Sequence, residues 1–458
     1  MTRRPIHRQL FAELRASIAG GTLRGGTRLP STRDFAQQRG VSRKTAEEAY
    51  AQLEAEGYVE RRVGSGTYVC ELPLPARRKA RLEGRRTLSA RGRTSGKSMA
   101  CVEPLEIRAF AAGLPALDHF PLATWQRLVS SHARRLDTSA LVYGDPAGDP
   151  ALREAVAAYL GSARGVHCDA SQVVIVSSSQ EALHLLAHLL LDPGDAAWLE
   201  EPGYYGARAA LTSAGARIVP VPVDGDGLDV AAGVALAPQA RVAYVTPSNH
   251  YPLGCSMSLD RRLELLAWAR RGDAWIIEDD YDGEFRYDGR PLTAIQGLDS
   301  AGRVIYVGTF TKSLYPALRL AYAVLPQDLV ASFVAARTQV DGHPPPFLQR
   351  VTADFLSFGH FDAHLKRMRA LYRERRDLAV RLLSKHVELG PANAGFRVVA
   401  FTRGDDRDLA ARGARAGLDL PTLSRLYLGK PRHGLVLGYM GLTPAALTQS
   451  VKALAKLV

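Results

Sequence analysis

The sequence predicts an α/β protein that carries a small helix-rich domain ahead of its main domain. In residues 105–458, short apolar runs alternate with helical patterns, as in a sheet covered by helices. In residues 1–70, helical segments instead precede a hairpin pattern. Residues 71–104 are rich in Arg, Pro, Gly and Ser and poor in large apolar side chains. We therefore expect a domain, a linker and a second domain over these three ranges.

Three helices are predicted in the N-terminal domain. Apolar residues share one face of the segment 7–19, which Gly20 ends. The run 31–34, Ser-Thr-Arg-Asp, is typical of a capping box and opens a second helix that Gly40 closes. A third helix begins just after Ser42.

A hairpin is predicted after the third helix. Residues 58–63 and 66–69 form its two strands. Helix, turn, helix and hairpin in this order make a winged helix-turn-helix, which binds DNA. A small helical domain for protein contacts is the alternative. The residues expected at the DNA are Arg33, Ser42, Arg43, Lys44, Thr45, Gly64, Ser65, Gly66 and Thr67.

Positive charge is concentrated near the N-terminus. Residues 1–100 hold 21 Lys and Arg against 9 Asp and Glu, and the whole chain has a formal net charge of +13. Phosphate neutralisation dominates DNA affinity, so this distribution favours double-stranded DNA over a protein partner. The excess of Arg and Lys and the lack of apolar residues also predict that the linker 71–104 is flexible.

In the main domain, strands are predicted where apolar runs are bounded by Gly, Pro or Asp. Functional groups in such sheets lie at strand ends. The runs are 173–176, 196–199, 217–221, 242–245, 274–277, 304–307 and 320–325, followed by 396–401 and 435–439 and by a helix over 444–457.

A lysine after one of these strands has the surroundings that pyridoxal 5'-phosphate requires. Lys312 ends the run Gly-Thr-Phe-Thr-Lys, directly after the strand 304–307. Its amine is suited to forming a Schiff base with the aldehyde of that cofactor. Thr309, Thr311 and Arg319 can bind the phosphate, and Arg319 can do so through its forked guanidinium.

An acidic run upstream, Glu-Asp-Asp-Tyr at 278–281, supplies side chains that can contact the ring of the cofactor. A carboxylate such as Asp279 against the pyridine nitrogen keeps the ring protonated, so that the ring withdraws electrons. Tyr281 can hydrogen-bond the ring hydroxyl. The two motifs in this order and spacing predict a site for the cofactor.

With these motifs, residues 105–458 resemble the fold-type I aminotransferases, which have a large α/β domain and a small C-terminal domain. Residues 143–153 are similar to the tyrosine segment that reaches the partner subunit's phosphate. Residues 177–182 are similar to the phosphate cup at a helix start, and 201–205 to the segment whose aromatic stacks on the ring. The resemblance implies further cofactor contacts from Tyr143, Ser178, Ser179, Gln180, Tyr204 and Asn249.

Two positions depart from that pattern. Ser178 stands where the phosphate cup usually has glycine. Tyr251 holds the place of the asparagine that contacts the ring hydroxyl, so Asn249 and His250 are the candidate substitutes. The effector's acidic group is expected at Arg432 or Arg208, with Arg425 as a further candidate, and a surface arginine is the alternative for each.

Residues 29–33, 57–58 and 64–67 resemble the GntR-type DNA-binding domain. Such a domain, a linker and an aminotransferase-like domain in this order resemble the MocR-type regulators (the GabR group) over essentially the whole chain. The resemblance implies a transcriptional regulator that senses pyridoxal 5'-phosphate, a small amino-compound effector or both. It also implies a head-to-tail homodimer, and we expect an operator with two half-sites.

The alternative function is an active aminotransferase with a fused DNA-binding domain, since Lys312, Asp279, Tyr281 and Arg319 are retained. The sequence is compatible with γ-aminobutyrate, taurine, D-alanine-like compounds or the cofactor alone as the effector. It does not distinguish an activator from a repressor. No apolar run approaches the roughly twenty residues of a membrane span. The 4 cysteines show neither metal-ligand nor disulfide spacing, so a cytoplasmic protein without a signal peptide or a metal is expected.

Overall fold

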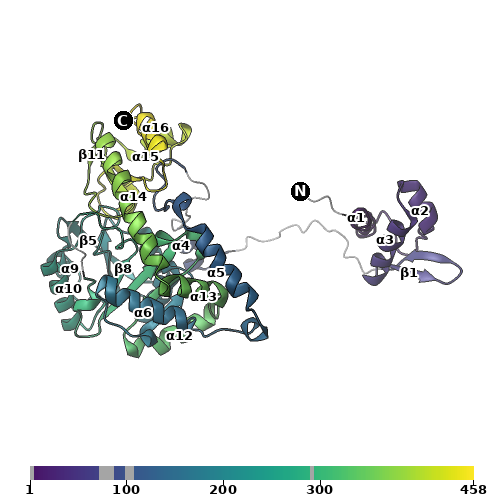
Figure 1. Cartoon of the computed structure of the whole chain (residues 1–458), viewed down its shortest axis with the longest axis horizontal. Helices are drawn as coiled ribbons and strands as arrows, with labels where there is room; N and C mark the ends of the chain where they lie inside the picture. Colours follow the sequence, from purple (N-terminus) through teal and green to yellow (C-terminus); the bar gives the residue numbers. More distant parts are fainter. Residues whose placement is uncertain (1–4, 72–86, 98–107, 289–292) are drawn as a thin grey trace. The chain divides into compact units, whose positions relative to one another are not determined.

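The structure, a computed structural model, describes residues 5–71, 87–97, 108–288 and 293–458 (Figure 1). The chain divides into two compact units, Met1–Thr87 and Leu88–Val458, which are described separately below. Most of the predicted linker, 72–86 and 98–104, lies outside the described residues. Its described part includes helix α4 (Ala90–Lys97), which the sequence did not predict. The hydroxyl of Ser89 accepts a hydrogen bond from the Gly92 N–H at the start of this helix.

The N-terminal unit has the predicted winged helix-turn-helix elements. Its apolar residues form one core, in which Ala46, Ala49, Tyr50 and Leu53 of the third helix are fully buried. The rings of Phe35 and Tyr50 lie 5.3 Å apart and join the second helix to the third. The elements are α1 (Ile6–Ala19), α2 (Thr32–Arg39), α3 (Arg43–Ala55), β1 (Val59–Arg62) and β2 (Gly66–Val69).

An eight-stranded sheet forms the centre of the second unit, with strand order β3-β10-β9-β8-β7-β4-β5-β6. Strands β9, β8, β7, β4 and β5 pair in parallel, whereas β10 is antiparallel to both β9 and β3. Each apolar run predicted as a strand in this range is one. The strands are β3 (Val173–Val176), β4 (Ala196–Glu201), β5 (Arg217–Asp224), β6 (Gly227–Leu228), β7 (Val242–Val245), β8 (Trp275–Asp280), β9 (Val304–Thr309) and β10 (Ala321–Val324).

Helices cover both faces of this sheet, so its strands are apolar on both sides. In β3, Val174 and Val176 pack against α7, α8 and α12, whereas Val173 and Ile175 pack into the cluster that includes α6, α13 and α14. The α-helices of the unit that follow α4 are α5 (Leu122–Arg134), α6 (Pro150–Arg164), α7 (Ser179–Leu190), α8 (Tyr205–Ser213), α9 (Val230–Leu236), α10 (Leu259–Arg271), α11 (Phe310–Ser313), α12 (Gln327–Val340), α13 (Pro346–Ser357), α14 (His360–Leu383), α15 (Asp406–Arg415) and α16 (Pro444–Leu454). Its short 3-10 helices are η1 (Leu117–His119), η2 (Thr138–Leu141), η3 (Ala170–Gln172), η4 (Gln296–Leu298), η5 (Pro316–Leu318) and η6 (Ser424–Leu426). None of the described helices has the length and apolar composition that a bilayer crossing requires.

A three-stranded antiparallel sheet forms the smaller C-terminal part, as the aminotransferase resemblance implies. Its strands are β11 (Glu388–Leu389), β12 (Arg397–Phe401) and β13 (Gly434–Gly438), in that order. One face of this sheet packs on α14, the long helix that leads to it from α13 (Figure 1). On the other face, Val399 and Val436 pack near Tyr205, Tyr251 and Leu253 of the large domain. This second face meets the ends of the large-domain strands.

Several carboxyl groups are buried near those strand ends. Glu200, at 1% exposure, accepts hydrogen bonds from the Thr246 N–H and hydroxyl at 3.1 and 2.7 Å. Burial raises the pKa of Glu200 to about 8 and lowers the pKa of the neighbouring His250 to about 3. Both side chains are therefore largely neutral near pH 7, since burial disfavours the charged form of each.

This burial predicts a pH-dependent stability. The folded state holds a proton on Glu200 that the unfolded state releases above its usual pKa of 4.5, so stability is lost as the pH rises toward about 8. The 4 tryptophans all lie in residues 88–458, so their fluorescence follows urea unfolding of this unit in the full chain. Between pH 5 and pH 8, the free energy of unfolding should fall less in Glu200→Gln than in the wild-type protein, by roughly 1–3 kcal/mol. If the free energy of unfolding depended on pH in the same way in both proteins, the raised pKa of Glu200 would be contradicted.

Candidate functional site

Five strand ends bring the predicted site residues to one edge of the large sheet. Strands β9, β8, β7 and β4 run in parallel, and β3 runs in the same direction because two antiparallel pairings through β10 separate it from β9. Their C-terminal ends therefore lie at the same edge, where α/β sheets bind ligands. The residues that follow these ends are Ser178 after β3, Tyr204 after β4, Asn249 after β7, Tyr281 after β8 and Lys312 after β9.

Lys312 projects from the short helix α11, which Thr309 caps by accepting a hydrogen bond from the Thr311 N–H at 3.1 Å. The Lys312 amine donates a hydrogen bond to the carbonyl of Gly113 at 2.9 Å. A Cβ atom at Gly113 would lie 2.6 Å from this amine, and the residue has a φ of +87°. The backbone at Gly113 therefore comes close to the lysine amine. Only glycine allows this approach, because it has no Cβ atom and adopts a positive φ without strain.

Asp279 is buried beside this lysine with one oxygen available. Its Oδ2 accepts a hydrogen bond from the Tyr244 hydroxyl at 2.8 Å, which sets the orientation of the carboxyl group. Its Oδ1 is buried and has no hydrogen-bond partner among the described residues. Burial raises the pKa of Asp279 to about 7, whereas the charge of Lys312 acts to lower it. A cationic or N–H-bearing group against Oδ1 would satisfy this oxygen and favour the carboxylate.

Tyr281 joins Asn249 to a residue that the sequence did not single out. Its hydroxyl donates to the Asn249 carbonyl at 2.6 Å and accepts a hydrogen bond from the Arg397 guanidinium. The Asn249 amide donates to Asp282 Oδ2 at 2.8 Å, and its own Oδ1 has no partner among the described residues. Asn249 and Tyr281 thus lie together, as the predicted ring-hydroxyl contacts require.

The predicted phosphate cup forms the start of α7. The Ser178 hydroxyl accepts a hydrogen bond from the Glu181 N–H, and Glu181 accepts one from the Ser177 N–H at 2.7 Å. Gln180 donates through its side chain to the Gly206 carbonyl at 3.0 Å, while Ser179 is the first residue of the helix. The orphan N–H groups of a helix start favour an anion.

Arg319 follows the same strand as Lys312, one short 3-10 helix farther on. It is exposed, with a left-handed φ of 54°, and its side chain has no hydrogen bond or ion pair within the described parts of the chain. Thr309 and Thr311 are in hydrogen-bond contact at 3.0 Å between their hydroxyls. These groups, together with α7, are the donors available to a phosphate.

Tyrosine rings surround the space between these groups. Tyr204 lies near-parallel to Tyr244, with 6.5 Å between ring centroids, and meets Tyr251 edge-on at 5.4 Å. Tyr143 is 94% exposed, and its ring lies 5.9 Å from the ring of His343. In this single chain, Tyr143 therefore does not lie among the described site residues around Lys312.

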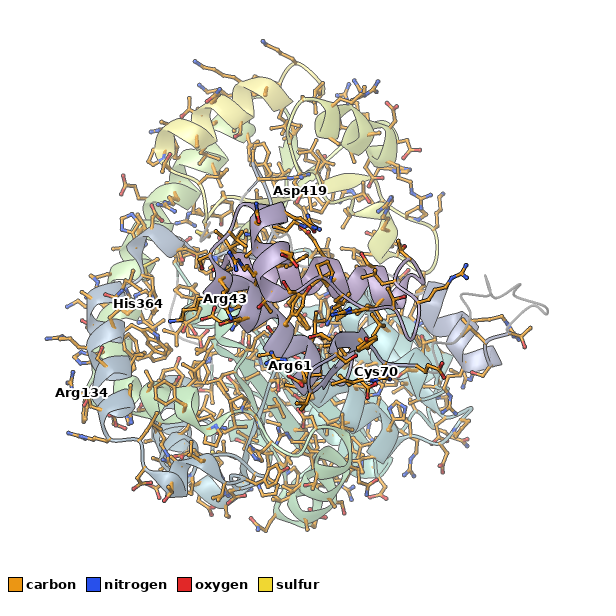
Figure 2. The ribbon with its side chains drawn as sticks, turned by 90° about the vertical axis from the view of Figure 1, so that its right-hand side faces the viewer. Arg43, Arg61, Cys70, Arg134, His364 and Asp419 are labelled. Carbon is orange, nitrogen blue, oxygen red and sulfur yellow. The ribbon has the colours of Figure 1, made fainter. Side chains whose placement is uncertain are left out.

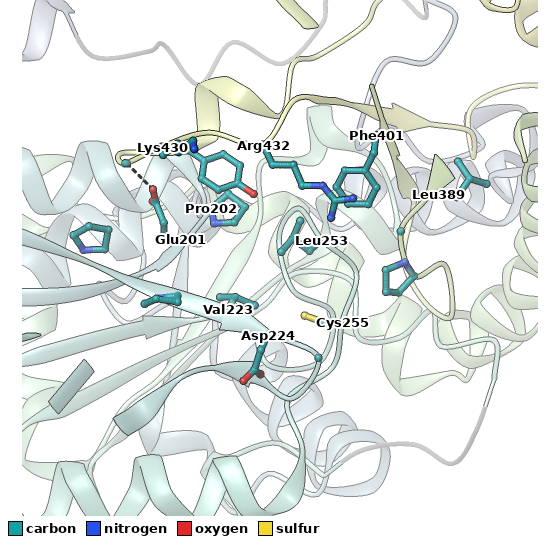
Figure 3. A pocket seen from close by; sticks show the side chains of 17 residues that line it. Glu201, Pro202, Val223, Asp224, Leu253, Cys255, Leu389, Phe401, Lys430 and Arg432 are labelled. Atoms are coloured by element: carbon teal, nitrogen blue, oxygen red, sulfur yellow. Dashed lines mark hydrogen bonds between the residues drawn. The ribbon is translucent and has the colours of Figure 1, made fainter. Parts of the chain in front are cut away.

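The arginines predicted for an effector lie on the small domain and on α8. Arg432 pairs with Glu388 at 2.8 Å and stacks over Phe401 with its Cζ 3.3 Å from the ring centroid. It lines a cavity of about 710 Å³ between β5 and the small sheet (Figure 3). Arg208 donates to the backbone carbonyl of Arg425 at 3.4 Å.

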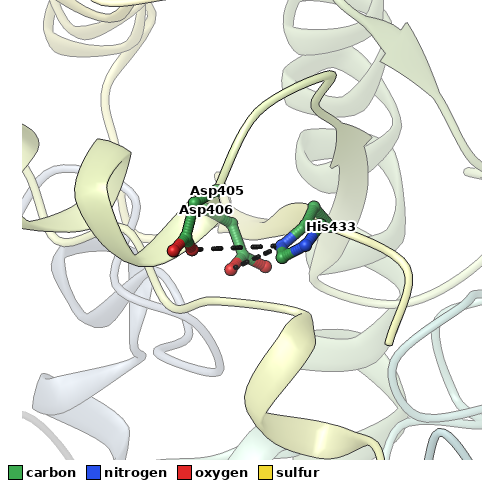
Figure 4. A group of neighbouring side chains, drawn as sticks. All are labelled: Asp405, Asp406 and His433. Carbon is green, nitrogen blue, oxygen red and sulfur yellow. Dashed lines mark hydrogen bonds and ion pairs between the residues drawn. The ribbon is translucent and has the colours of Figure 1, made fainter. Parts of the chain in front are cut away.

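A group of acidic residues and a histidine on the small domain has a structural role. Asp405, Asp406 and His433 lie within 4.8 Å of one another through their ligand atoms (Figure 4). However, Asp406 already accepts hydrogen bonds from the Ser424 N–H and hydroxyl and from the Gly434 N–H. These bonds tie the start of α15 to η6 and β13.

The predicted DNA-contacting residues lie on the surface of the winged unit. Ser42 caps α3 by accepting from the Thr45 N–H at 3.1 Å, and Lys44 is exposed beside it. Arg43, labelled in Figure 2, is 69% exposed and pairs with Glu47 one turn along. In the wing, Gly64 and Gly66 have φ values of 74° and 117°, which the tight turn around Ser65 and Thr67 requires. Arg33 is exposed at the start of α2.

The residues at the site that the sequence analysis missed include a glycine and an arginine. Gly113 and Arg397 lie 199 and 85 positions from Lys312 along the chain, outside every motif. The only signal for Arg397 was a charged residue at the start of an apolar strand, and such a residue is more often at the surface. Its burial follows from the packing of the small sheet.

Comparisons with known proteins agree with this architecture. Residues 110–416 match the family described as aminotransferase class I and II, and residues 6–69 match bacterial regulatory proteins of the gntR family. A solved kynurenine aminotransferase from Pyrococcus horikoshii superposes with a TM-score of 0.72 at 27% identity, covering 83% of this chain and 96% of the other.

Relatives with both domains match nearly the whole chain. The probable rhizopine catabolism regulatory protein MocR of Rhizobium meliloti is 43% identical over 461 residues, covering 98% of this chain and 93% of the relative. The HTH-type transcriptional regulator TauR of Rhodobacter capsulatus is 35% identical, covering 98% and 95%. The chain therefore belongs to the MocR-type family of transcriptional regulators, in which a GntR-type DNA-binding domain is joined to an aminotransferase-like domain.

Proposed function

We propose that this regulator binds pyridoxal 5'-phosphate at Lys312 and changes its occupancy of operator DNA in response to an amino compound. The observation that carries the proposal is the convergence of Lys312 and Asp279 at one sheet edge, with Asp279 Oδ1 buried and lacking a partner among the described residues. The aminotransferase fold normally binds this cofactor. The attached winged unit provides the DNA-binding output.

The residues at the sheet edge fit the cofactor. Asp279 Oδ1 would accept a hydrogen bond from the protonated ring nitrogen, which would satisfy a buried oxygen. Tyr281 and Asn249 would face the ring hydroxyl, and Tyr204 would stack on the ring. The phosphate would be held by Ser178, Ser179, Gln180, Thr309, Thr311 and Arg319. When bound, the cofactor supplies an aldehyde for the lysine amine and a ring that withdraws electrons.

The protein's own groups would then control protons and position. Tyr244 holds the Asp279 carboxyl in place through Oδ2 and so keeps Oδ1 directed at the ligand space. Gly113 accepts a hydrogen bond from the Lys312 amine, which keeps this amine at the site before it reacts. With the cofactor bound, the nearby tyrosine rings would shield these charges from water, which would strengthen each electrostatic contact.

A second copy of the chain is the proposed protein partner. Leu141, Val142 and Tyr143 are consecutive and 77%, 68% and 94% exposed. Adjacent exposed apolar side chains of this size favour burial in an interface. In fold-type I aminotransferases, which the chain resembles, the tyrosine of this segment reaches the phosphate of the partner subunit. A homodimer, head-to-tail as in the MocR resemblance, is therefore proposed, with one Tyr143 at each site.

For the effector, we propose an amino compound whose acidic group contacts an arginine, with Arg432 and Arg208 as the candidates from the sequence. Arg432 lines a cavity with Lys430, so two cations face that space (Figure 3). Its guanidinium is already paired with Glu388, and an incoming anion would compete with that carboxylate.

The first functional prediction concerns the lysine. Lys312→Ala should abolish the borohydride-trappable cofactor adduct, because Lys312 is the lysine that the described residues place at this sheet edge, with its amine on the Gly113 carbonyl. Mass spectrometry of the reduced protein measures the adduct, and Lys366→Ala, an exposed lysine on α14, is the matched control. An adduct at another lysine in the Lys312→Ala protein would refute the assignment.

The second prediction concerns DNA. Arg43→Ala with Lys44→Ala should weaken binding to the DNA upstream of the protein's own gene by at least about tenfold, because the start of α3 faces phosphates and base edges. Arg8→Ala with Arg15→Ala removes the same charge from α1 and is the control. Gel shifts at several salt concentrations measure both affinity and its salt dependence. Equal affinities for the two double variants would contradict a specific role for α3.

The third prediction concerns the response. A ligand shifts a conformational equilibrium only through its different affinity for the two forms, so an effector that contacts both domains of the aminotransferase-like unit should favour a closed form. Footprinting and small-angle scattering of the cofactor-loaded protein should therefore change when a compound alters the cofactor's visible absorbance. A steady-state transamination assay on the same compound tests the enzymatic alternative. Unchanged footprints and scattering would refute the proposed effect of ligand binding at the Lys312 site on DNA binding.

A further inference from the structure

The cavity of about 710 Å³ between β5 and the small sheet lies apart from the group around Lys312 (Figure 3). Neither Lys312 nor Asp279 is among the described residues that line it. Lys312 follows β9, and β8, β7 and β4 separate that strand from β5. Four strand spacings of about 4.8 Å place the β5 wall roughly 19 Å from β9 along the sheet. The cavity is therefore a separate space, and its size suits a small organic molecule.

Two cations on the small-domain wall of this cavity keep donors that the protein does not use. Lys430 is exposed and makes no hydrogen bond or ion pair within the described parts of the chain. The Arg432 guanidinium lies over the Phe401 ring and donates to Glu388 through Nη2. Its Nε and Nη1 make no hydrogen bond to a described residue, although a guanidinium has donors on all three nitrogens. Both side chains can therefore bind a further anion.

The carboxylates that line the cavity are more fully engaged by the protein. Glu201 Oε1 accepts hydrogen bonds from the N–H groups of Leu428 and Gly429, each at 2.7 Å. Its Oε2 has no partner among the described residues but is buried, so it presents no surface to a ligand. Asp224 Oδ2 pairs with Arg261 at 3.1 Å. Because these acids are compensated and the cations keep unused donors, the cavity is complementary to an anion.

Apolar side chains form much of the remaining lining. Val223 on β5, Leu253 in the loop after β7 and Phe401 on β12 all face the cavity (Figure 3). Burial raises the pKa of the Cys255 thiol to about 12, so this lining residue adds no negative charge near pH 7. Apolar walls with a few polar groups are typical of a site for an organic ligand.

We infer that this cavity is a second ligand site, which binds an organic anion with an apolar body and a carboxylate or phosphate group. Lys430 and Arg432 bind the acidic group, and Phe401 and Leu253 contact the apolar body. The inference goes beyond the proposed function, because this ligand needs no amine and does not react with a cofactor. Arg432 then serves a ligand that does not extend to Lys312.

Two segments connect the cavity with the Lys312 site. Pro202 lines the cavity two residues before Tyr204, and Leu253 lines it two residues after Tyr251. The rings of Tyr204 and Tyr251 meet edge-on at 5.4 Å. A ligand that contacts both segments therefore acts on side chains proposed to surround the cofactor. This coupling rests on the proposed function, and because coupling is reciprocal, the anion and the cofactor change each other's affinity.

The test is calorimetric titration of the full-length protein, both without cofactor and with pyridoxal 5'-phosphate reduced onto Lys312 by borohydride. The probes are phenylacetate and phenyl phosphate. Phenylacetamide is the uncharged match, and acetate and inorganic phosphate lack the apolar body. At least one aromatic anion should bind both forms of the protein. It should bind at least about tenfold more tightly than the three matches, because charge and apolar contact act together.

Variants locate the anion. Lys430→Gln with Arg432→Gln should raise its dissociation constant by at least about tenfold and abolish the preference over phenylacetamide, an effect that a merely structural role would not produce. Both positions are exposed, so the fold should be retained. Lys452→Gln with Arg415→Gln removes the same charge from exposed positions outside the cavity and should leave the dissociation constant within about twofold. A saturating anion should also change the affinity for pyridoxal 5'-phosphate by at least about threefold.

Each contrary outcome has a distinct meaning. Aromatic anions that bind no more tightly than phenylacetamide, or that bind only the cofactor-free protein, would overturn the second site. Equal losses in the two double variants would overturn the role of Lys430 and Arg432, and an unchanged cofactor affinity would overturn the coupling. A protein that forms no borohydride-trapped adduct would refute the proposed function, and titration of the cofactor-free protein would then decide whether the cavity binds the anion.

Discussion

The common direction of five strands is the constraint on which the candidate site depends. Because β3, β4, β7, β8 and β9 end at one edge of the sheet, residues between positions 178 and 312 of the chain come together there. The antiparallel strand β10 lies between β3 and β9 and preserves the direction of both. Reversal of any one of the five would move its polar residue to the opposite edge of the sheet.

This edge is built with polar groups that the protein itself does not fully satisfy. Asp279, Asn249 and Arg397 each bury an atom without a partner among the described residues, although most buried polar atoms in proteins are paired. These groups include side chains of both signs of charge, Asp279 and Arg397. Such a site costs stability in the free protein and is suited to a ligand that carries complementary charges.

The small domain closes the site through a few close contacts. Arg397 reaches Tyr281, Gly395 lies against Asn249 and Asp282, and Val399 and Val436 pack near Tyr251. A ligand held from both domains gains affinity only when they are correctly placed, so binding and domain position are linked. In the function proposed above, this link would transmit effector binding to the DNA-binding unit without any turnover.

The sequence by itself determined the fold class, the family and the local elements. Helix caps such as Ser31 and Ser42, the wing glycines and the apolar runs act over a few residues, so their outcome can be predicted without tertiary contacts. The motifs around Asp279 and Lys312 likewise indicated a cofactor site, because each lies at the C-terminal end of a strand. Helix α4 and the contacts of Gly113 and Arg397 were decided only by tertiary structure. A glycine or an arginine outside a motif has the same sequence signature whether it is buried or exposed. Its role depends on which distant strands and domains pack around it.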